Sequence, residues 1–156
     1  MSGAGRFEVR RGHTLAARLL AVLLRLPRSG PAVLVRVRID RWPGEHAEVW
    51  TRAFGTRRLV SRQYRAGPDV IERIGPVELL FRVTLGADQV GYEQQGTRVR
   101  LAGRSVPLPA RVCPNIRATA RACGEASLLV TVIVAMPRGK PLLSYSGRLD
   151  EEAPRW

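Results

Sequence analysis

Short runs of alternating apolar and polar residues, separated by turn residues, are the feature of this sequence that most constrains its fold. The clearest run extends from Val77 to Leu85, where every second residue is apolar. A period of two is typical of a strand with one buried face. Similar runs recur from Ala32 to Leu149, with connections of hairpin length between them. The spacing predicts a mainly β protein, an antiparallel meander of eight to ten strands that is strongly curved or barrel-like, because a sheet this long must hide its edges.

One segment, Gly12–Leu26, has a helical period instead. Thr14 is the predicted N-cap, apolar residues recur at helical spacing, and Pro27 ends the segment. We expect this N-terminal helix to pack on the sheet, over the row of small residues in the run 116–122, which makes the class α+β. Two arginines interrupt its apolar run, so it is unlike a secretory signal or a membrane span. An amphipathic helix lying on a membrane surface stays open.

The length of 156 residues fits one domain with a sizeable core. We expect residues 1–11 to be a flexible basic N-terminus, residues 12–149 to form a single globular domain, and residues 150–156 to be a C-terminal tail. The connector 103–109 contains two prolines and cannot lie in a central strand ladder.

The chain is strongly basic, with a formal net charge of +13, and among its 26 basic residues only Lys140 is a lysine. A charge of this size is typical of proteins that bind a nucleic acid or an anionic membrane. The arginines, however, are spread over the whole length with no dense block and no recognised nucleic-acid motif. The pattern therefore indicates coding composition, and we do not expect a nucleic-acid partner.

The sequence lacks the common catalytic signatures, including the glycine-rich phosphate loops, the nucleophile elbow and the HExxH motif. His13 and His46 are far apart and read as surface or helix-start residues. Cys113 and Cys123 have no metal-ligand spacing, and we interpret them as reduced unless two strand ends bring them close. We expect no metal and no cofactor.

The stretch from Glu48 to Pro76 concentrates the distinctive side chains. In an extended segment Trp50, Arg52 and Phe54 share one face, because side chains alternate along a strand. If that face points outward, it forms an aromatic stripe suited to binding. If it points inward, Arg52 needs a carboxylate partner, for which Glu72 is our prediction. Inward placement leaves two interpretations open: a core with a structural ion pair, or a pocket lined by these groups.

In the pocket hypothesis a curved sheet encloses an apolar or amphipathic small molecule. Arg52 anchors its acidic head group. The predicted ligand-binding residues are Trp50, Arg52, Phe54, Ser61, Glu72, Phe81 and Tyr145. For Tyr145 the alternative is a core tyrosine with its hydroxyl at the rim.

A series of short motifs resembles the bacterial family known as domain of unknown function 4166 over nearly the whole chain, from Arg11 to Leu149. Their order and spacing carry the resemblance: Arg11-Gly12, Leu26-Pro27, Trp50-x-Arg52-x-Phe54-Gly55, Ser61, Glu72-Arg-x-Gly-Pro76, Leu108-Pro109, Pro114, Pro137 and Tyr145-x-Gly147-x-Leu149. Relatives occur alone or joined to a nucleotide-binding domain like that of saccharopine dehydrogenase or short-chain dehydrogenases. The resemblance implies an oxidoreductase partner or a membrane-associated pathway, and it supplies no catalytic residues. Arg148 stands where the family pattern has an aromatic residue.

Together these observations predict a non-enzymatic binding domain for a hydrophobic or amphipathic small molecule. One alternative is an interaction module that docks on a nucleotide-binding oxidoreductase or an anionic membrane. Another is an enzyme that uses Glu48 or Glu72 as a base. We expect a cytoplasmic protein, with peripheral contact at the inner membrane as an open alternative.

Overall fold

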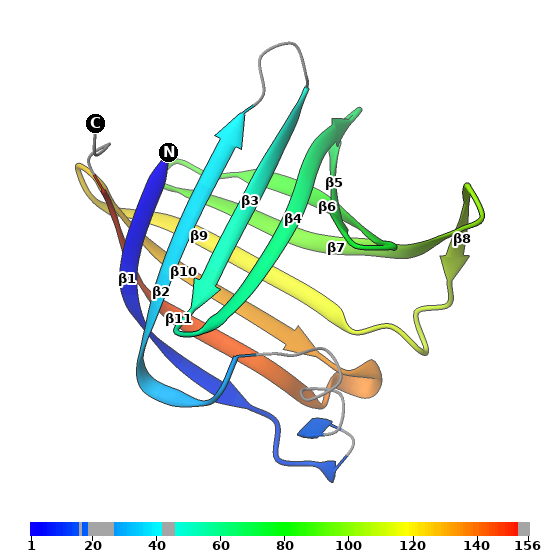
Figure 1. Ribbon diagram of the computed structural model, residues 1–156, viewed down its shortest axis with the longest axis horizontal. Coiled ribbons are helices and arrows are strands. Elements are labelled where there is room, and N and C mark those ends of the chain that lie inside the picture. Colours follow the sequence, from blue (N-terminus) through cyan, green and yellow to red (C-terminus); the bar gives the residue numbers. More distant parts are fainter. Residues whose placement is uncertain (16, 19–26, 42–45, 153–156) are drawn as a thin grey trace.

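Ten antiparallel strands close into a barrel in the computed structural model, which describes residues 1–15, 17–18, 27–41 and 46–152 (Figure 1). The strands follow one another around the barrel in chain order, and the circle closes where β1 pairs with β11. The prediction of a mainly β, antiparallel, barrel-like fold is confirmed. The strands are β1 (Ser2–Arg11), β2 (Gly30–Arg41), β3 (Ala47–Phe54), β4 (Arg57–Ala66), β5 (Asp69–Ile74), β6 (Val77–Leu85), β7 (Gln89–Leu101), β8 (Arg104–Leu108), β9 (Asn115–Gly124), β10 (Ser127–Ala135) and β11 (Pro141–Glu151).

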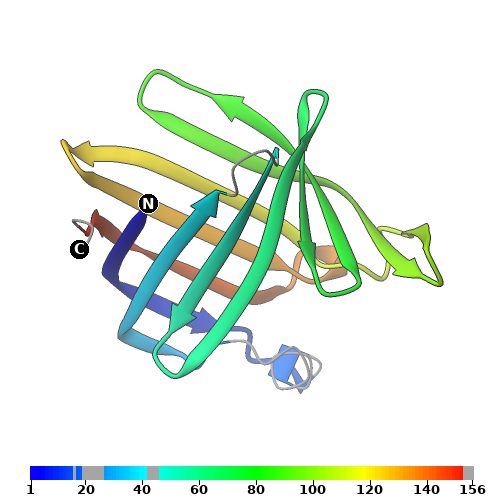
Figure 2. The same cartoon turned by 45° about the horizontal axis from the view of Figure 1, so that its top comes forward.

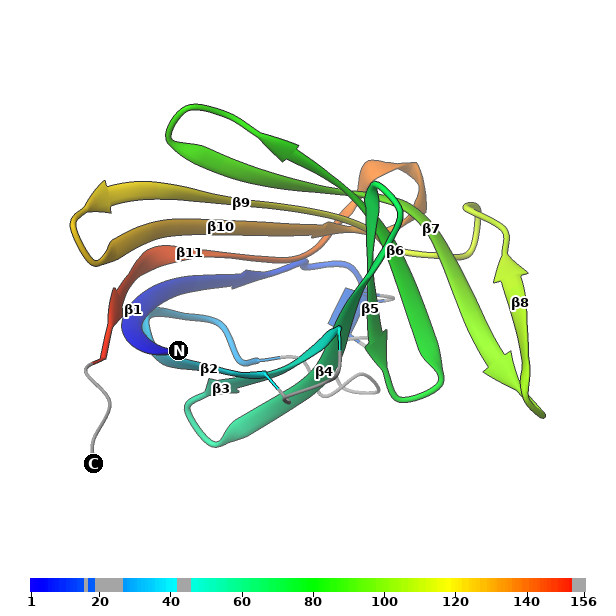
Figure 3. The same ribbon diagram turned by 90° about the horizontal axis from the view of Figure 1, so that it is seen from above.

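The barrel is flattened, so that two groups of strands face each other. Figure 3 shows β9, β10 and β11 passing over β2, β3 and β4, with β1 curving along one side and β5 and β6 along the other. Inward-pointing residues of the two groups therefore meet across the interior. The short connection between β10 and β11 contains one 3-10 turn, η1 (Pro137–Gly139).

An eleventh strand, β8, lies outside the ring and projects from it (Figure 2). We expected the segment 103–109 to be a connector. It pairs instead with the second half of β7, from Leu101↔Arg104 to Thr97↔Leu108. Pro107 is compatible with this strand because β8 is at an edge, where a missing N–H leaves no ladder partner unsatisfied.

Strand β7 is one long strand with an irregularity near Gly96. Its register with β6 shifts between Leu80 and Phe81, opposite Gly96 and Gln94. The first half of β7 pairs with β9, and the second half pairs with β8. The side chain of Gln94 bridges the place where β9 separates from β7: its Nε2 donates to Pro114 O at 3.1 Å, and its Oε1 accepts from Ile116 N at 3.0 Å.

Replacing Gln94 with alanine is expected to lower the free energy of unfolding by about 1–3 kcal/mol, because Pro114 O and Ile116 N lose their partner in a half-buried place. Urea denaturation measures the change. The matched control is Gln95→Ala, whose side chain is exposed and donates only to Glu93 O of its own strand. Equal losses for the two variants would contradict the bridging role.

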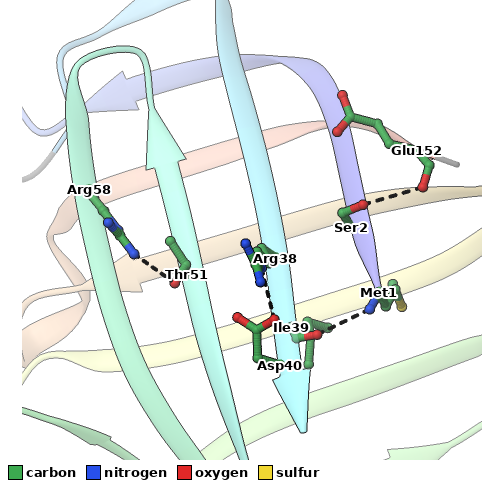
Figure 4. A network of polar contacts seen from close by, with 8 residues as sticks. All are labelled: Met1, Ser2, Arg38, Ile39, Asp40, Thr51, Arg58 and Glu152. Carbon is green, nitrogen blue, oxygen red and sulfur yellow. Dashed lines mark hydrogen bonds and ion pairs between the residues drawn. The ribbon is translucent and has the colours of Figure 1, made fainter. Parts of the chain in front are cut away.

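Our expectation of a flexible N-terminus over residues 1–11 is wrong. Ser2–Arg11 form β1, which lies between β11 and β2 and completes the barrel. Figure 4 shows how this end is held: the Met1 amino group donates to Ile39 O at 3.1 Å, and Ser2 Oγ donates to Glu152 O at 3.3 Å. The strand was missed because its glycines and charges hide the inward pair Phe7 and Val9.

The expected C-terminal tail begins two residues too early. Strand β11 extends to Glu151, and Glu152 N still donates to Ser2 O at 2.9 Å. Residues 153–156 lie outside the described residues.

The predicted N-terminal helix packed on the sheet is not borne out. In the predicted segment Gly12–Leu26, residues 16 and 19–26 lie outside the described part of the chain. The described part holds a single turn, in which Thr14 Oγ1 accepts from Ala17 N at 3.1 Å, as the predicted N-cap requires. In the strand ladder, Ala118 of β9 pairs with Val132 of β10 and with Tyr92 of β7, and both partners lie on the inner face. The small residues of β9 therefore face the barrel interior.

The core lies inside the barrel, around the strands that close it. Buried residues from β1, β2, β3 and β11 form one cluster: Phe7, Val9, Val35, Phe54, Leu143 and Leu149. Phe7 lies opposite Gly147 on β11. A Cβ at position 147 would approach the Phe7 ring to 2.7 Å, so only glycine leaves room for this ring. Among the described residues, no helix is long and apolar enough to cross a membrane.

Candidate functional site

Three polar side chains meet on the inner face of the barrel. Arg52 on β3 lies on the same face as Phe54, and both are paired with inward valines of β2, Val37 and Val35. Ser61 enters from β4 opposite Trp50, and Glu72 enters from β5 opposite Gln63. Three consecutive strands thus place Arg52, Ser61 and Glu72 side by side. We call these three residues the inner polar cluster.

The inner polar cluster is tightly connected. Arg52 Nη1 donates to Glu72 Oε1 at 2.7 Å and to Ser61 Oγ at 2.8 Å, and Ser61 Oγ donates to Glu72 Oε1 at 2.5 Å. The side chains of Arg52 and Glu72 are 15% and 11% exposed. Of the two placements that the sequence left open, the structure shows the inward one, and the predicted pairing of Arg52 with Glu72 is confirmed. A guanidinium this deep requires such a partner.

Trp50 extends the cluster along β3. The Arg52 guanidinium carbon lies 4.9 Å from the centre of the Trp50 ring, a distance at which a cation is attracted by the ring face. Trp50 Nε1 donates to Glu48 Oε2 at 3.0 Å, and Glu48 also binds Arg41 at 2.6 Å. Trp50 is therefore fixed at both its ring and its N–H, and its indole borders the guanidinium.

Two tyrosines approach the cluster from the opposite wall. Tyr145 on β11 contacts the ring of Phe54 across the interior, with ring centres 5.2 Å apart. Burial raises the pKa of Tyr145, while Arg52 lowers it and Glu72 raises it. Burial also raises the pKa of Tyr92 on β7, with further contributions from Glu48 and Glu72. Both phenols thus lie within electrostatic range of the inner polar cluster.

Several N–H and O–H groups of Arg52, Tyr92 and Tyr145 have no hydrogen-bond partner among the described residues. Arg52 donates only through Nη1 to the described residues, and the hydroxyls of Tyr92 and Tyr145 have no hydrogen-bond partner among them. No buried side-chain nitrogen or oxygen of the described residues lacks a partner. Arg52 Nε, Arg52 Nη2 and both phenol oxygens are therefore not fully buried, although they lie on the inner face.

Apolar residues of the inner face are also only partly covered. Val132 and Ala118 lie beside Tyr145 and Tyr92 in the strand ladder, and both are half-buried. Leu59, opposite Arg52 on β4, is 37% exposed. Side chains that fill a dry core would be buried, as Phe7 and Val35 are. The inner face is thus fully buried around Phe7 and partly exposed around Arg52.

The seven residues predicted to bind a ligand are all on the inner face, in two groups. Trp50, Arg52 and Tyr145 keep accessible surface. The other four are buried and support them: Phe54, Ser61, Glu72 and Phe81. Phe81 contacts Tyr92, with ring centres 6.3 Å apart, rather than Tyr145 or Phe54. Sequence reasoning missed Tyr92, whose place on the inner face follows from its pairing with Val83 on β6 and Ala118 on β9.

The other groups considered for chemistry are not assembled into a site. His13 and His46 are exposed, Cys113 is buried and Cys123 exposed, and both cysteines are free. No group of three or more His, Cys, Asp or Glu residues in the described ranges could hold a metal ion. The two carboxylates considered as bases already accept hydrogen bonds, Glu48 from Arg41 and Trp50, and Glu72 from Arg52 and Ser61.

The three tyrosines of the chain predict an alkaline transition. The pKa values of Tyr64, Tyr92 and Tyr145 are all raised above 10.0, with burial as the largest cause. A raised pKa means that the protein binds these protons more tightly than the unfolded chain does. The contribution to stability is full below pH 10 and is lost as the pH rises through the folded pKa values.

We therefore expect phenolate absorbance to appear only above pH 10, together with a fall in the unfolding free energy measured in urea. Tyr145→Phe should make this fall shallower. Ionisation of all three phenols near pH 10 without loss of stability would contradict the placement of Tyr145 in the interior.

The model of a family described as Domain of unknown function (DUF4166) matches residues 1–149, which is nearly the whole chain. A search of curated proteins found no match.

Proposed function

The chain belongs to the DUF4166 family, whose description assigns no activity, and we propose that its barrel binds an amphipathic small molecule with one acidic group. The ligand lies in the interior. Its acidic group accepts hydrogen bonds from Arg52, and its apolar part lies against the half-buried side chains of the inner face.

The observation that carries this proposal is the orientation of Arg52. Its Nη1 is held by Glu72 and Ser61, so the guanidinium is fixed before a ligand arrives. Its Nε and Nη2 keep N–H groups with no partner among the described residues. A planar guanidinium presents such groups in the geometry that a carboxylate accepts. The hydroxyls of Tyr92 and Tyr145 supply further donors nearby.

The size of the barrel is consistent with a ligand. An eight-stranded barrel is just wide enough to be filled by side chains or to hold one small molecule, and the diameter grows with the number of strands. With ten strands, and with Ala118 and Ala120 on the inner face, this barrel is wider than an eight-stranded one and has small side chains on one wall. The aromatic residue Trp50 and the valines of β10 give this space apolar walls.

A pair of ligands tests the role of Arg52. Oleic acid and oleyl alcohol have the same chain and differ in the head group. The fluorescence of Trp50 reports on binding at the site in a protein whose other two tryptophans, Trp42 and Trp156, are replaced by phenylalanine. We expect the acid to bind more tightly than the alcohol. In Arg52→Gln this preference should fall by about tenfold or more, since hydrogen bonds between charged groups contribute about 1.5–3 kcal/mol.

The matched control is Arg58→Gln. Arg58 is exposed on the outer face of β4, within 3.5 Å of Thr51, and its loss changes the net charge equally (Figure 4). A preference for the acid that survives in a folded Arg52→Gln protein would overturn the proposal. So would equal losses in the two variants. Native mass spectrometry of the purified protein, followed by organic extraction, identifies a ligand already bound.

A further inference from the structure

A second concave site lies at the end of the barrel where β1 ends and β3 turns into β4. This pocket, of about 390 Å³, is lined by the residues between β1 and β2 and by the β3–β4 turn: Arg28, Ser29, Val33, Phe54, Gly55, Thr56 and Arg57. Gly55 has a φ of 57°, as the first residue of a tight two-residue hairpin turn requires. Two arginines and two hydroxyls thus surround one opening, with Val33 and Phe54 as apolar lining.

A third arginine adds to the positive charge. Arg11 Nε donates to Pro27 O at 2.5 Å, which holds Arg11 next to the start of the pocket. Burial lowers the pKa of Arg11, and so do the charges of Arg57 and Arg28. The three cations are therefore close enough to destabilise one another. Like charges brought together raise the affinity of a site for an anion.

The two stretches of sequence that line the pocket contain no acidic residue. The chain contains no Asp or Glu from Val9 to Ile39, and none from Val49 to Pro68. These two stretches contribute every residue that lines the pocket. The carboxylates of the described ion pairs mostly lie elsewhere: Asp40, Asp69, Asp88 and Asp150 are at the opposite end of the barrel, near the ends of β2 and β11 or the starts of β5 and β7.

We propose that the pocket between Arg28 and Arg57 binds a phosphate group, which belongs either to a small phosphorylated molecule or to a phospholipid head group. Arginine is suited to this because its planar fork donates two parallel hydrogen bonds to phosphate oxygens. Ser29 and Thr56 are exposed at the pocket and provide hydroxyl donors. This site lies outside the inner polar cluster, so it goes beyond the function proposed above.

The first arm of the test uses inorganic phosphate in solution. NMR follows the amide shifts of Gly55 and Thr56 during a titration with phosphate, and potassium chloride at equal ionic strength serves as the reference. We expect Arg28→Gln to weaken binding by about tenfold. Arg28 is exposed, so the substitution preserves the fold. Arg57→Gln is the second variant and should have a similar effect.

Arg58→Gln is the matched control. It removes the neighbouring arginine and the same charge, but Arg58 does not line the pocket. Its effect on phosphate binding should stay within about twofold, because an exposed charge that does not contact the bound anion is screened by salt.

The second arm uses vesicles of phosphatidylcholine with or without phosphatidic acid, and co-sedimentation measures binding. Saturable binding of inorganic phosphate that depends on Arg28 and Arg57 supports a soluble ligand. Binding only to phosphatidic-acid vesicles, with the same dependence, supports a lipid head group. The proposal is overturned if neither probe binds, or if Arg58→Gln weakens binding as much as the two pocket variants. Oleic acid binding depends on Arg52 and reports separately on the barrel interior.

Discussion

Replacing Glu72 with alanine is expected to lower the free energy of unfolding by about 3 kcal/mol or more. Glu72 Oε1 accepts hydrogen bonds from both Arg52 and Ser61, and its side chain is only 11% exposed. Without it, the Arg52 charge remains on the inner face with no carboxylate partner. Removing one member of a buried ion pair typically costs about 3–5 kcal/mol for this reason. Urea denaturation followed by circular dichroism measures the loss.

The double variant Arg52→Met with Glu72→Leu is the control. It removes both charges together and should recover much of the stability, because apolar residues of similar volume replace a buried pair at little cost. The exposed pair Arg121 and Asp88, with side chains 63% and 51% exposed, gives the surface reference. Asp88→Ala should cost no more than about 1 kcal/mol. A loss of that size for Glu72→Ala would contradict the buried ion pair.

Replacing Gly147 with alanine is expected to destabilise the protein by about 3 kcal/mol or more, and to loosen the closure of the barrel. The added Cβ would lie 2.4 Å from Arg6 O and 2.7 Å from Cγ of Phe7. Arg6 O belongs to the backbone of β1, and the Phe7 ring is buried in the core, so neither moves without cost. Overpacking a filled core costs about 1–3 kcal/mol, and a backbone contact adds to this. Urea denaturation and protease resistance measure the effect.

Gly96→Ala is the matched control for this substitution. Gly96 lies in β7, where an added Cβ would have no heavy atom within 4 Å. At such a position alanine is neutral or stabilising by about 0.4–1 kcal/mol, because it restricts the unfolded chain. Similar stabilities for Gly147→Ala and the parent protein would show that the closing strands β1 and β11 adjust to the added methyl group.

The sequence predicts the part of the candidate site that depends on the alternation of side chains along a single strand. Alternation along β3 places Trp50, Arg52 and Phe54 on one face, and the cost of an unpaired guanidinium points to Glu72 as the partner. This alternation does not determine which strands face each other across a barrel. The contact of Tyr145 with Phe54, the approach of Tyr92 and the pocket at Arg28 depend on distant segments, and none follows from local sequence.

The sequence by itself determined the strands from β2 to β11 except β8, because a period of two and the glycine and proline turns act over a few residues. The alternation in β2 and β6 needs no tertiary contact to be recognised. Only the tertiary structure decided that Ser2–Arg11 form a strand and that the meander closes. Phe7 and Val9 become core residues only when β11 places Gly147 opposite Phe7, 140 positions along the chain, and Tyr145 opposite Val9. Closure depends on pairing between the two ends of the sequence, and a local pattern cannot contain the hydrogen bonds and the packing that such a distant partner provides.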